Sequence, residues 1–106
     1  MPKMLIAVNY TAEGTKGLIK EGGSARRAAV QKLVEGIGGK VETFYYAYGE
    51  HDAYLIVDMP NPTSGLALSL AVNASGAVRL KTIPLISPEE IDTASKQAVP
   101  YRAPGA

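Results

Sequence analysis

The order in which strand-like and helix-like segments follow one another constrains this chain more than any other feature. Short apolar runs rich in branched residues have strand length, and longer segments repeat apolar residues at helical spacing. The expected strands are residues 3–10, 41–48, 53–59 and 78–86. A first helical turn is expected at residues 11–20, and two long helices are expected at 24–37 and 62–75. A further short helix is expected at residues 88–97.

Residues that favour helix ends support these boundaries. Hydroxyl side chains that can accept hydrogen bonds from a first helical turn precede three of the helices, at Thr11, Ser24 and Ser87. The last of these opens the capping-box sequence SPEE. Gly39 and Gly76 each follow a helix and precede a strand, so each is expected to take the positive φ of a helix C-cap.

The resulting order, strand, helix, strand, strand, helix, strand, is the split βαβ arrangement. It predicts an α+β, ferredoxin-like fold (βαββαβ) with a four-stranded antiparallel sheet and an extra short C-terminal helix. Crossover connections are right-handed in nearly all proteins, which puts both long helices on one face of the sheet. We expect a single domain over residues 1–97 and a loose tail over residues 98–106.

Composition narrows the class of partner. Hydrophobic residues make up 46% of the 106 residues, enough for a core, and the formal net charge is +1. We therefore expect no nucleic-acid partner, and we interpret the pair Arg26-Arg27 as a solvated helix face. The chain has no cysteine, which excludes disulfides and thiolate chemistry. The apolar run in MPKMLIAVNY is too short for a signal peptide or a membrane span, so we expect a cytoplasmic protein without a membrane partner.

The segment FYYAYGEHDAYLIVD at residues 44–58 predicts a hairpin that is apolar on both faces. With the turn at residues 49–52, or at Gly49-Glu50, one face carries Phe44, Tyr46, Tyr48, Ala53, Leu55 and Val57. The other face carries Val41, Thr43, Tyr45, Ala47, Tyr54 and Ile56. A sheet covered by helices on one side normally alternates between apolar and polar residues.

The apolar character of the second face predicts a partner, because large exposed apolar patches mark interaction sites. We expect a second copy stacked sheet to sheet, which makes the protein a homodimer or a higher homo-oligomer. The helix PTSGLALSLAVNASG also predicts contacts with a partner. It lacks a strongly polar side, so it is expected to be buried on more than one side.

Two blocks of the sequence resemble the GYD-domain family. They are YTAEGTKGLIKEGGSARRAAVQKLVEGIGGKVETFYYAYGEHDAYLIVDMP and LALSLAVNASGAVRLKTIPLISPEEID, and the resemblance covers residues 4–94. It implies a ferredoxin-like, dimeric α+β barrel and no particular activity. The motif that names the family usually has tyrosine between the acidic residue and the aspartate, where this chain has His51.

The only histidine, His51, has two interpretations. Its ordinary pKa suits a general base, and its imidazole could ligate a metal. The alternative is an exposed turn residue, because adjacent residues in a turn rarely converge on one ion. Gly49 and Asp52 have turn roles of their own, one through positive φ and the other through hydrogen bonds to the backbone.

A small cavity in the barrel, lined by tyrosines with charge from the fourth strand, would suit a flat organic molecule. The candidate ligand-binding residues are Tyr46, Tyr48, His51, Asp52, Tyr54 and Arg79, with Tyr10 and Lys81 as further wall residues. The glycines form no nucleotide-binding fingerprint and no serine-nucleophile motif is present, so we expect no cofactor and no metal.

Two functions fit these features. The first is a non-enzymatic oligomeric module that binds a small molecule or a protein. The second is a cofactor-independent enzyme, similar to a monooxygenase or an isomerase, acting on an aromatic or carbonyl compound. The absence of a convergent catalytic set in the sequence favours the first.

Overall fold

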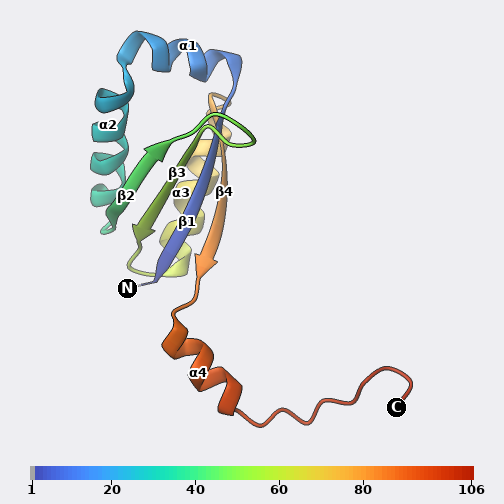
Figure 1. Ribbon diagram of the computed structural model, residues 1–106. Helices are drawn as coiled ribbons and strands as arrows, with labels where there is room; N and C mark the ends of the chain where they lie inside the picture. Colours follow the sequence, from blue (N-terminus) through green and yellow to red (C-terminus); the bar gives the residue numbers. More distant parts are fainter. Residues whose placement is uncertain (1) are drawn as a thin grey trace.

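The computed structural model describes residues 2–106 and consists of one sheet, three helices packed with it and a projecting C-terminal segment (Figure 1). The strands are β1 (Lys3–Tyr10), β2 (Lys40–Tyr46), β3 (Ala53–Asp58) and β4 (Val78–Leu85), antiparallel in the order β2-β3-β1-β4. The helices are α1 (Ala12–Glu21), α2 (Gly23–Gly36), α3 (Pro62–Ala74) and α4 (Pro88–Lys96). The α+β class and the four-stranded antiparallel sheet are confirmed.

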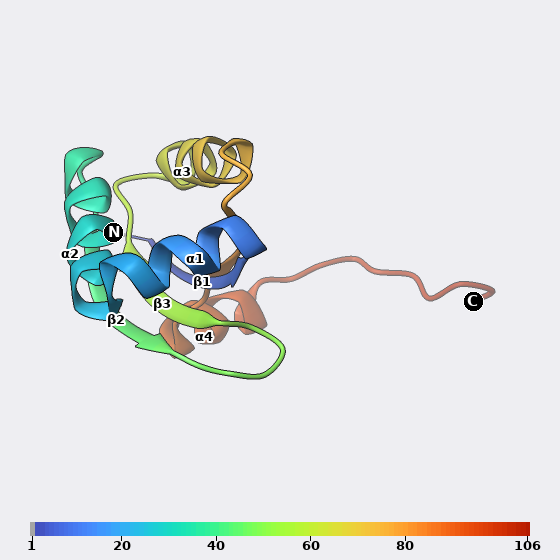
Figure 2. The same cartoon turned by 90° about the horizontal axis from the view of Figure 1, so that it is seen from above.

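Helices α2 and α3 lie on the same face of the sheet, and α1 crosses one end of that layer (Figure 2). We call this face the helix face and the opposite one the open face. Alternate residues of the strands point to each face, and those on the helix face form the core. The buried core residues are Met4, Ile6, Val8, Val34, Ala53, Leu55, Val57, Met59, Leu68 and Val78.

A β-bulge in β2 changes which residues face the core. Val41 pairs with Val57, whereas Thr43 pairs with Ile56, so the register shifts by one residue around Glu42. The extra residue turns Val41 onto the helix face, where it packs against the core. The prediction that Val41 shares the other face with Tyr54 was therefore wrong, because a period-two count assumes an unbroken register.

The helix starts follow local capping chemistry with one exception. Thr11 caps α1, and Ser87 and Glu90 form the predicted capping box of α4. Ser24 does not cap α2, which is a wrong prediction. Gly22, with φ of +91°, separates α1 from α2, and α2 begins directly after it. Glycine takes this conformation without strain, so a sharp bend replaces a side-chain cap.

Much of the apolar surface of α2 and α3 is not buried within one chain. In the predicted stripe of α2 only Val34 is buried, and Leu33 is 44% exposed. On α3, Leu68 packs in the core while Leu70 on the outer side is 63% exposed. The predicted burial of α3 on more than one side is therefore not found within a single chain.

The segment after β4 extends away from the rest of the molecule. Helix α4 projects beyond the end of the sheet, and residues 98–106 continue as an extended tail (Figure 1). Every residue from Pro88 to Ala106 is exposed. Among the helices of residues 2–106, none is long and apolar enough to cross a membrane.

The two glycines predicted to take positive φ differ. Gly76 has φ of +77°, as predicted, but after α2 it is Gly38, with φ of +85°, that takes the left-handed conformation. Gly39 is required for another reason. A Cβ atom there would lie 2.7 Å from the carbonyl oxygen of Asp58 and 2.9 Å from both Val34 Cγ1 and Met59 Sδ.

We predict that Gly39→Ala lowers the free energy of unfolding by roughly 1–3 kcal/mol, the usual cost of forcing an extra carbon into a packed site. Gly36→Ala is the matched control, because it lies in α2 with no atom within 4 Å of a built Cβ. It should be neutral or stabilising by up to about 1 kcal/mol. Urea denaturation of both variants measures the difference, and equal midpoints would contradict the close approach.

Candidate functional site

One end of the open face brings together part of the predicted ligand set. Tyr54 pairs with Ala7 on β1, and Ala7 pairs with Lys81 on β4, so these residues form one row across the sheet. Arg79 lies one pair further along β4, opposite Asn9. Tyr54, Arg79 and Lys81 therefore share a face and an end of the sheet, as the prediction of a common site requires.

His51 joins this group through two long-range contacts. Its Nδ1 lies 2.6 Å from Asn9 Oδ1, and its ring meets that of Tyr54 edge to face with the centroids 5.5 Å apart. The Asn9 amide nitrogen donates to the carbonyl oxygen of Glu50 at 2.9 Å, so Asn9 Oδ1 is an acceptor and His51 Nδ1 carries the proton. His51 is half-buried, and the interpretation of an exposed turn residue was wrong.

Asp52 has a structural role in the same loop. Its carboxylate accepts the backbone N–H of Tyr10 at 2.8 Å, and its own N–H donates to the carbonyl oxygen of Val8 at 2.8 Å. Ala47 N–H donates to the Asp52 carbonyl oxygen at 2.8 Å, so the connection spans residues 47–52 and is longer than the predicted turn. The carboxylate therefore anchors the loop to the end of β1.

Two predicted ligand residues lie elsewhere. Tyr48 is in the loop with its side chain fully exposed to solvent. Tyr46 is on the helix face, because it pairs with the buried Ala53. Its hydroxyl donates to the carbonyl oxygen of Gly23 at 2.9 Å, at the start of α2. The predicted tyrosine-lined cavity is therefore divided between the two sides of the sheet.

The phenol of Tyr46 is electrostatically unusual. Burial raises its pKa from 10.0 to about 12, and the neighbouring Tyr10 adds to the shift while Arg26 opposes it. Since burial disfavours the phenolate, Tyr46 remains a hydrogen-bond donor at neutral pH and holds the first turn of α2 against β2.

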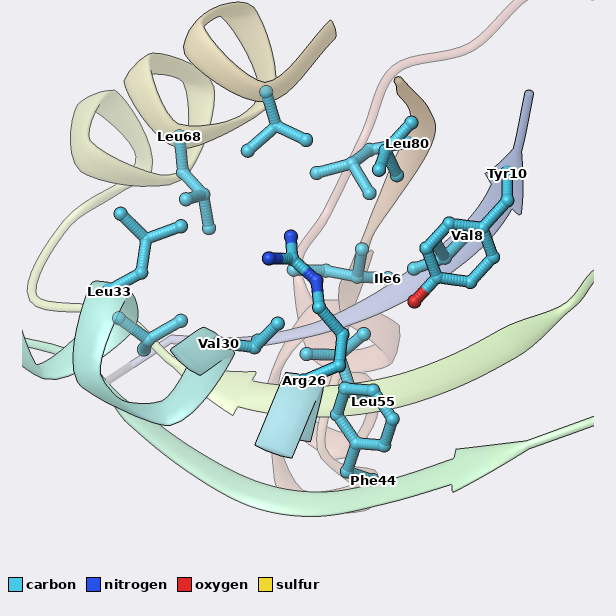
Figure 3. Close-up of a pocket in the computed structure, with 13 residues that line it drawn as sticks. Ile6, Val8, Tyr10, Arg26, Val30, Leu33, Phe44, Leu55, Leu68 and Leu80 are labelled. Carbon is cyan, nitrogen blue, oxygen red and sulfur yellow. The ribbon is translucent and has the colours of Figure 1, made fainter. Parts of the chain in front are cut away.

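A cavity of about 40 Å³ lies between α2, α3 and the sheet, and Figure 3 shows the residues that surround it. Its walls are apolar apart from Arg26 and Tyr10, and include Val30 of α2 and Leu68 and Val72 of α3. The Arg26 guanidinium points from α2 into the space between the apolar side chains (Figure 3). A second hollow of about 170 Å³ beneath α1 shares Tyr10 and Arg26 with this cavity.

The sequence pattern did not identify Arg26 as a residue of this cavity, because the pair Arg26-Arg27 was interpreted as a solvated helix face. Arg27 does lie exposed, but Arg26 is half-buried. The available signal was its spacing: Arg26 precedes Val30 by four residues and so shares the inward stripe of α2.

The opposite end of the open face carries a small ion-pair network. Lys3 on β1 donates to Glu42 of the bulge and to Asp58 of β3. These two carboxylates raise the pKa of Lys3 above its ordinary value of 10.5. Nowhere in residues 2–106 do three or more histidine or acidic side chains gather in a way that could hold a metal ion.

The fold and the sequence agree on one class, a small α+β domain with a half-covered antiparallel sheet. The family model described as the GYD domain matches residues 4–94, and the chain belongs to this family. No curated protein and no solved structure matches the chain.

We predict that Asp52→Ala destabilises the fold by roughly 1–3 kcal/mol, because the partly buried Tyr10 N–H loses its acceptor. Asp52→Asn keeps an acceptor oxygen and should cost less. Glu50→Ala, in the same loop but exposed, should change stability by less than about 0.5 kcal/mol. Chemical denaturation ranks the three variants, and an Asp52→Ala midpoint equal to that of Glu50→Ala would contradict the anchoring role.

We also predict that stability declines between pH 10 and about pH 12 through Tyr46. The unfolded chain releases this proton near 10 and the folded chain near 12, so the stabilisation is complete below pH 10 and is lost as the pH rises through 12. Near-ultraviolet titration of tyrosinate should show a late step that Tyr46→Phe removes. Tyr45→Phe, on the same strand, should leave that step in place.

Proposed function

We propose that this protein is a homodimeric binding module in which two copies pack sheet to sheet through their open faces. The observation that carries the proposal is the composition of the open face. Leu5, Ile56 and Ile83 form a row across three strands at its centre, and Ile83 is 47% exposed. No helix of residues 2–106 covers this row, and a second copy is the occupant that would exclude water from it.

The topology supports the same assembly. The strand order β2-β3-β1-β4 with α2 and α3 on one face is what a ferredoxin-like domain requires. In the proposed assembly two such sheets face each other as a dimeric α+β barrel, and the apolar rows interdigitate as in other sheet-on-sheet packings.

The ligand in this proposal is a small organic molecule held at the His51 end of the enclosed face. His51 donates from Nδ1 to Asn9, so Nε2 of the neutral ring is an acceptor for a ligand. The hydroxyl of Tyr54 and the cations Arg79 and Lys81 offer hydrogen-bond donors beside it. A polar end on an otherwise apolar surface is the usual composition of a ligand pocket.

A binding role is preferred to catalysis because the polar groups do not form an acid–base chain. Two carboxylates flank His51 in the sequence: that of Asp52 accepts the Tyr10 N–H, and Glu50 is exposed. Neither forms an ion pair with His51 within residues 2–106. Catalytic bases normally have a third group that orients and charges them. Here an uncharged amide, Asn9, orients the ring.

We predict that Ile83→Glu converts the dimer into a monomer, because a carboxylate without a partner is costly to bury in an apolar interface. Ile19→Glu is the matched control: Ile19 lies on α1, away from the sheet, and is 79% exposed. Light scattering coupled to gel filtration at micromolar concentration reads out the mass. A monomeric wild type, or dimers in both variants, would refute the interface.

A further inference from the structure

We propose that the two copies of the dimer pack with opposite ends of their open faces together. We call the end that carries His51, Arg79 and Lys81 the His51 end, and the end that carries Lys3 and leads into α4 the Lys3 end. In this arrangement α4 of each copy covers the His51 end of the other and supplies one wall of its ligand site. The inference rests on the sheet-to-sheet dimer of the proposed function and adds its orientation.

The surface of the single chain is too large for a compact monomer. Its accessible area is 7457 Å², whereas a folded monomer of this mass exposes roughly 5,700 Å². The Cα radius of gyration is 17.2 Å, against about 13 Å for a compact chain of this length. The excess area of roughly 1,800 Å² is more than the ~800 Å² that each partner buries in a stable interface. A second copy that covers both the open face and α4 would account for it.

Helix α4 stands at the Lys3 end without covering its own sheet. It projects past that end (Figure 1), on the side of the sheet opposite α3 (Figure 2). An open hollow of about 630 Å³ lies beside it, lined by Pro2, Lys3, Leu85, Ile86, Ser87 and Glu90. Ile91 on α4 is 58% exposed. The helix is therefore placed to contact a molecule that approaches the open face.

The His51 end carries two cations without partners. Arg79 and Lys81 lie on β4, and neither forms an ion pair within residues 2–106. In the adjoining loop Asp52 accepts the Tyr10 N–H, and Glu50 is exposed and forms no ion pair in that stretch either. Enclosure of the two cations by the same end of a second copy would be costly, because four like charges would meet in a partly dehydrated interface.

The Lys3 end offers the complementary charge. Helix α4 has three carboxylates and one lysine, and none of these groups forms an ion pair among the described residues 2–106. The carboxylates are those of Glu89, Glu90 and Asp92. Lys3, at the edge of the same hollow, is already paired with Glu42 and Asp58. Contact between unlike ends therefore places cations beside carboxylates, whereas contact between like ends brings equal charges together.

The register of β4 brings these groups to the same place. The central apolar row of the open face crosses β4 at Ile83. A two-fold axis along that row turns one sheet end over end relative to the other. The residue four positions before Ile83 in one copy then lies over the residue four positions after it in the second copy. Arg79 thus faces Ser87, the N-cap of α4, and the symmetry repeats this contact at the other end of the dimer.

The first experiment measures a distance across the dimer. The chain has no cysteine, so Tyr48→Cys accepts a single spin label in the β2–β3 loop, where Tyr48 is fully exposed. Unlike ends together put the two labels more than about 25 Å apart, since each strand residue adds ~3.4 Å. Like ends together put them within about 20 Å, since packed sheets lie about 10 Å apart. Pulsed electron–electron double resonance should give the long distance.

Charge reversal is the second experiment. Arg79→Glu with Lys81→Glu should weaken the dimer by on the order of tenfold or more, because carboxylates then face the carboxylates of α4. Adding Glu89→Lys and Asp92→Lys to the same chain should restore most of the affinity. The matched control is Lys16→Glu with Lys20→Glu, which makes the same charge change on exposed positions of α1. It should leave the dissociation constant within about threefold, as measured by sedimentation equilibrium.

The outcomes separate this inference from the dimer itself. A short label distance, no loss of affinity in the Arg79→Glu/Lys81→Glu variant, or a loss that the two lysines in α4 do not recover would each overturn the orientation. The open-face dimer would stand in these cases if Ile83→Glu still disrupts it, and a monomeric wild type would overturn both proposals. The label distance is measured with every charge of the wild type in place, so it decides the orientation even if a charge variant does not fold.

Discussion

The hydrogen bonding of β1 on both of its edges is the constraint on which the rest of the structure depends. β1 pairs with β3 over six residues and with β4 over eight, and it contributes three side chains to the buried core. Met4, Ile6 and Val8 point to the helices, and Leu5 and Ala7 point to the open face. A central strand must be apolar on both sides if both faces are to be covered.

The end of β1 also organises the polar loop between β2 and β3. Val8 accepts from the Asp52 N–H, Tyr10 donates to the Asp52 carboxylate, and the Asn9 side chain contacts both His51 and Glu50. Three successive residues of one strand thus hold a six-residue connection in place. The loop is therefore tied to the end of the central strand, and these contacts hold the His51 ring against Tyr54 of the open face.

The two faces of the sheet differ in how far their apolar side chains are covered within one chain. The helix face has a packed core with one small cavity, and Arg26 is the charged group that enters it. The open face has an apolar centre between two polar ends, one with His51 and Arg79 and the other with Lys3. The exposed apolar centre of the open face favours association with a partner, whereas the helix face is closed by its own packed core. The sheet separates the two faces, so a change on one face need not disturb the other.

The sequence by itself determined the elements and most of their ends, because capping and strand alternation depend on residues a few positions apart. Thr11, Ser87 and the four strands needed no knowledge of the fold. Only the tertiary structure decided which way Val41 points, since a bulge is a property of two paired strands rather than of one. It likewise decided the surroundings of His51 and Arg26, whose neighbours come from distant strands and helices. Side-chain periodicity fixes the face of an element, but the contacts across that face depend on registers and crossings that a local pattern does not contain.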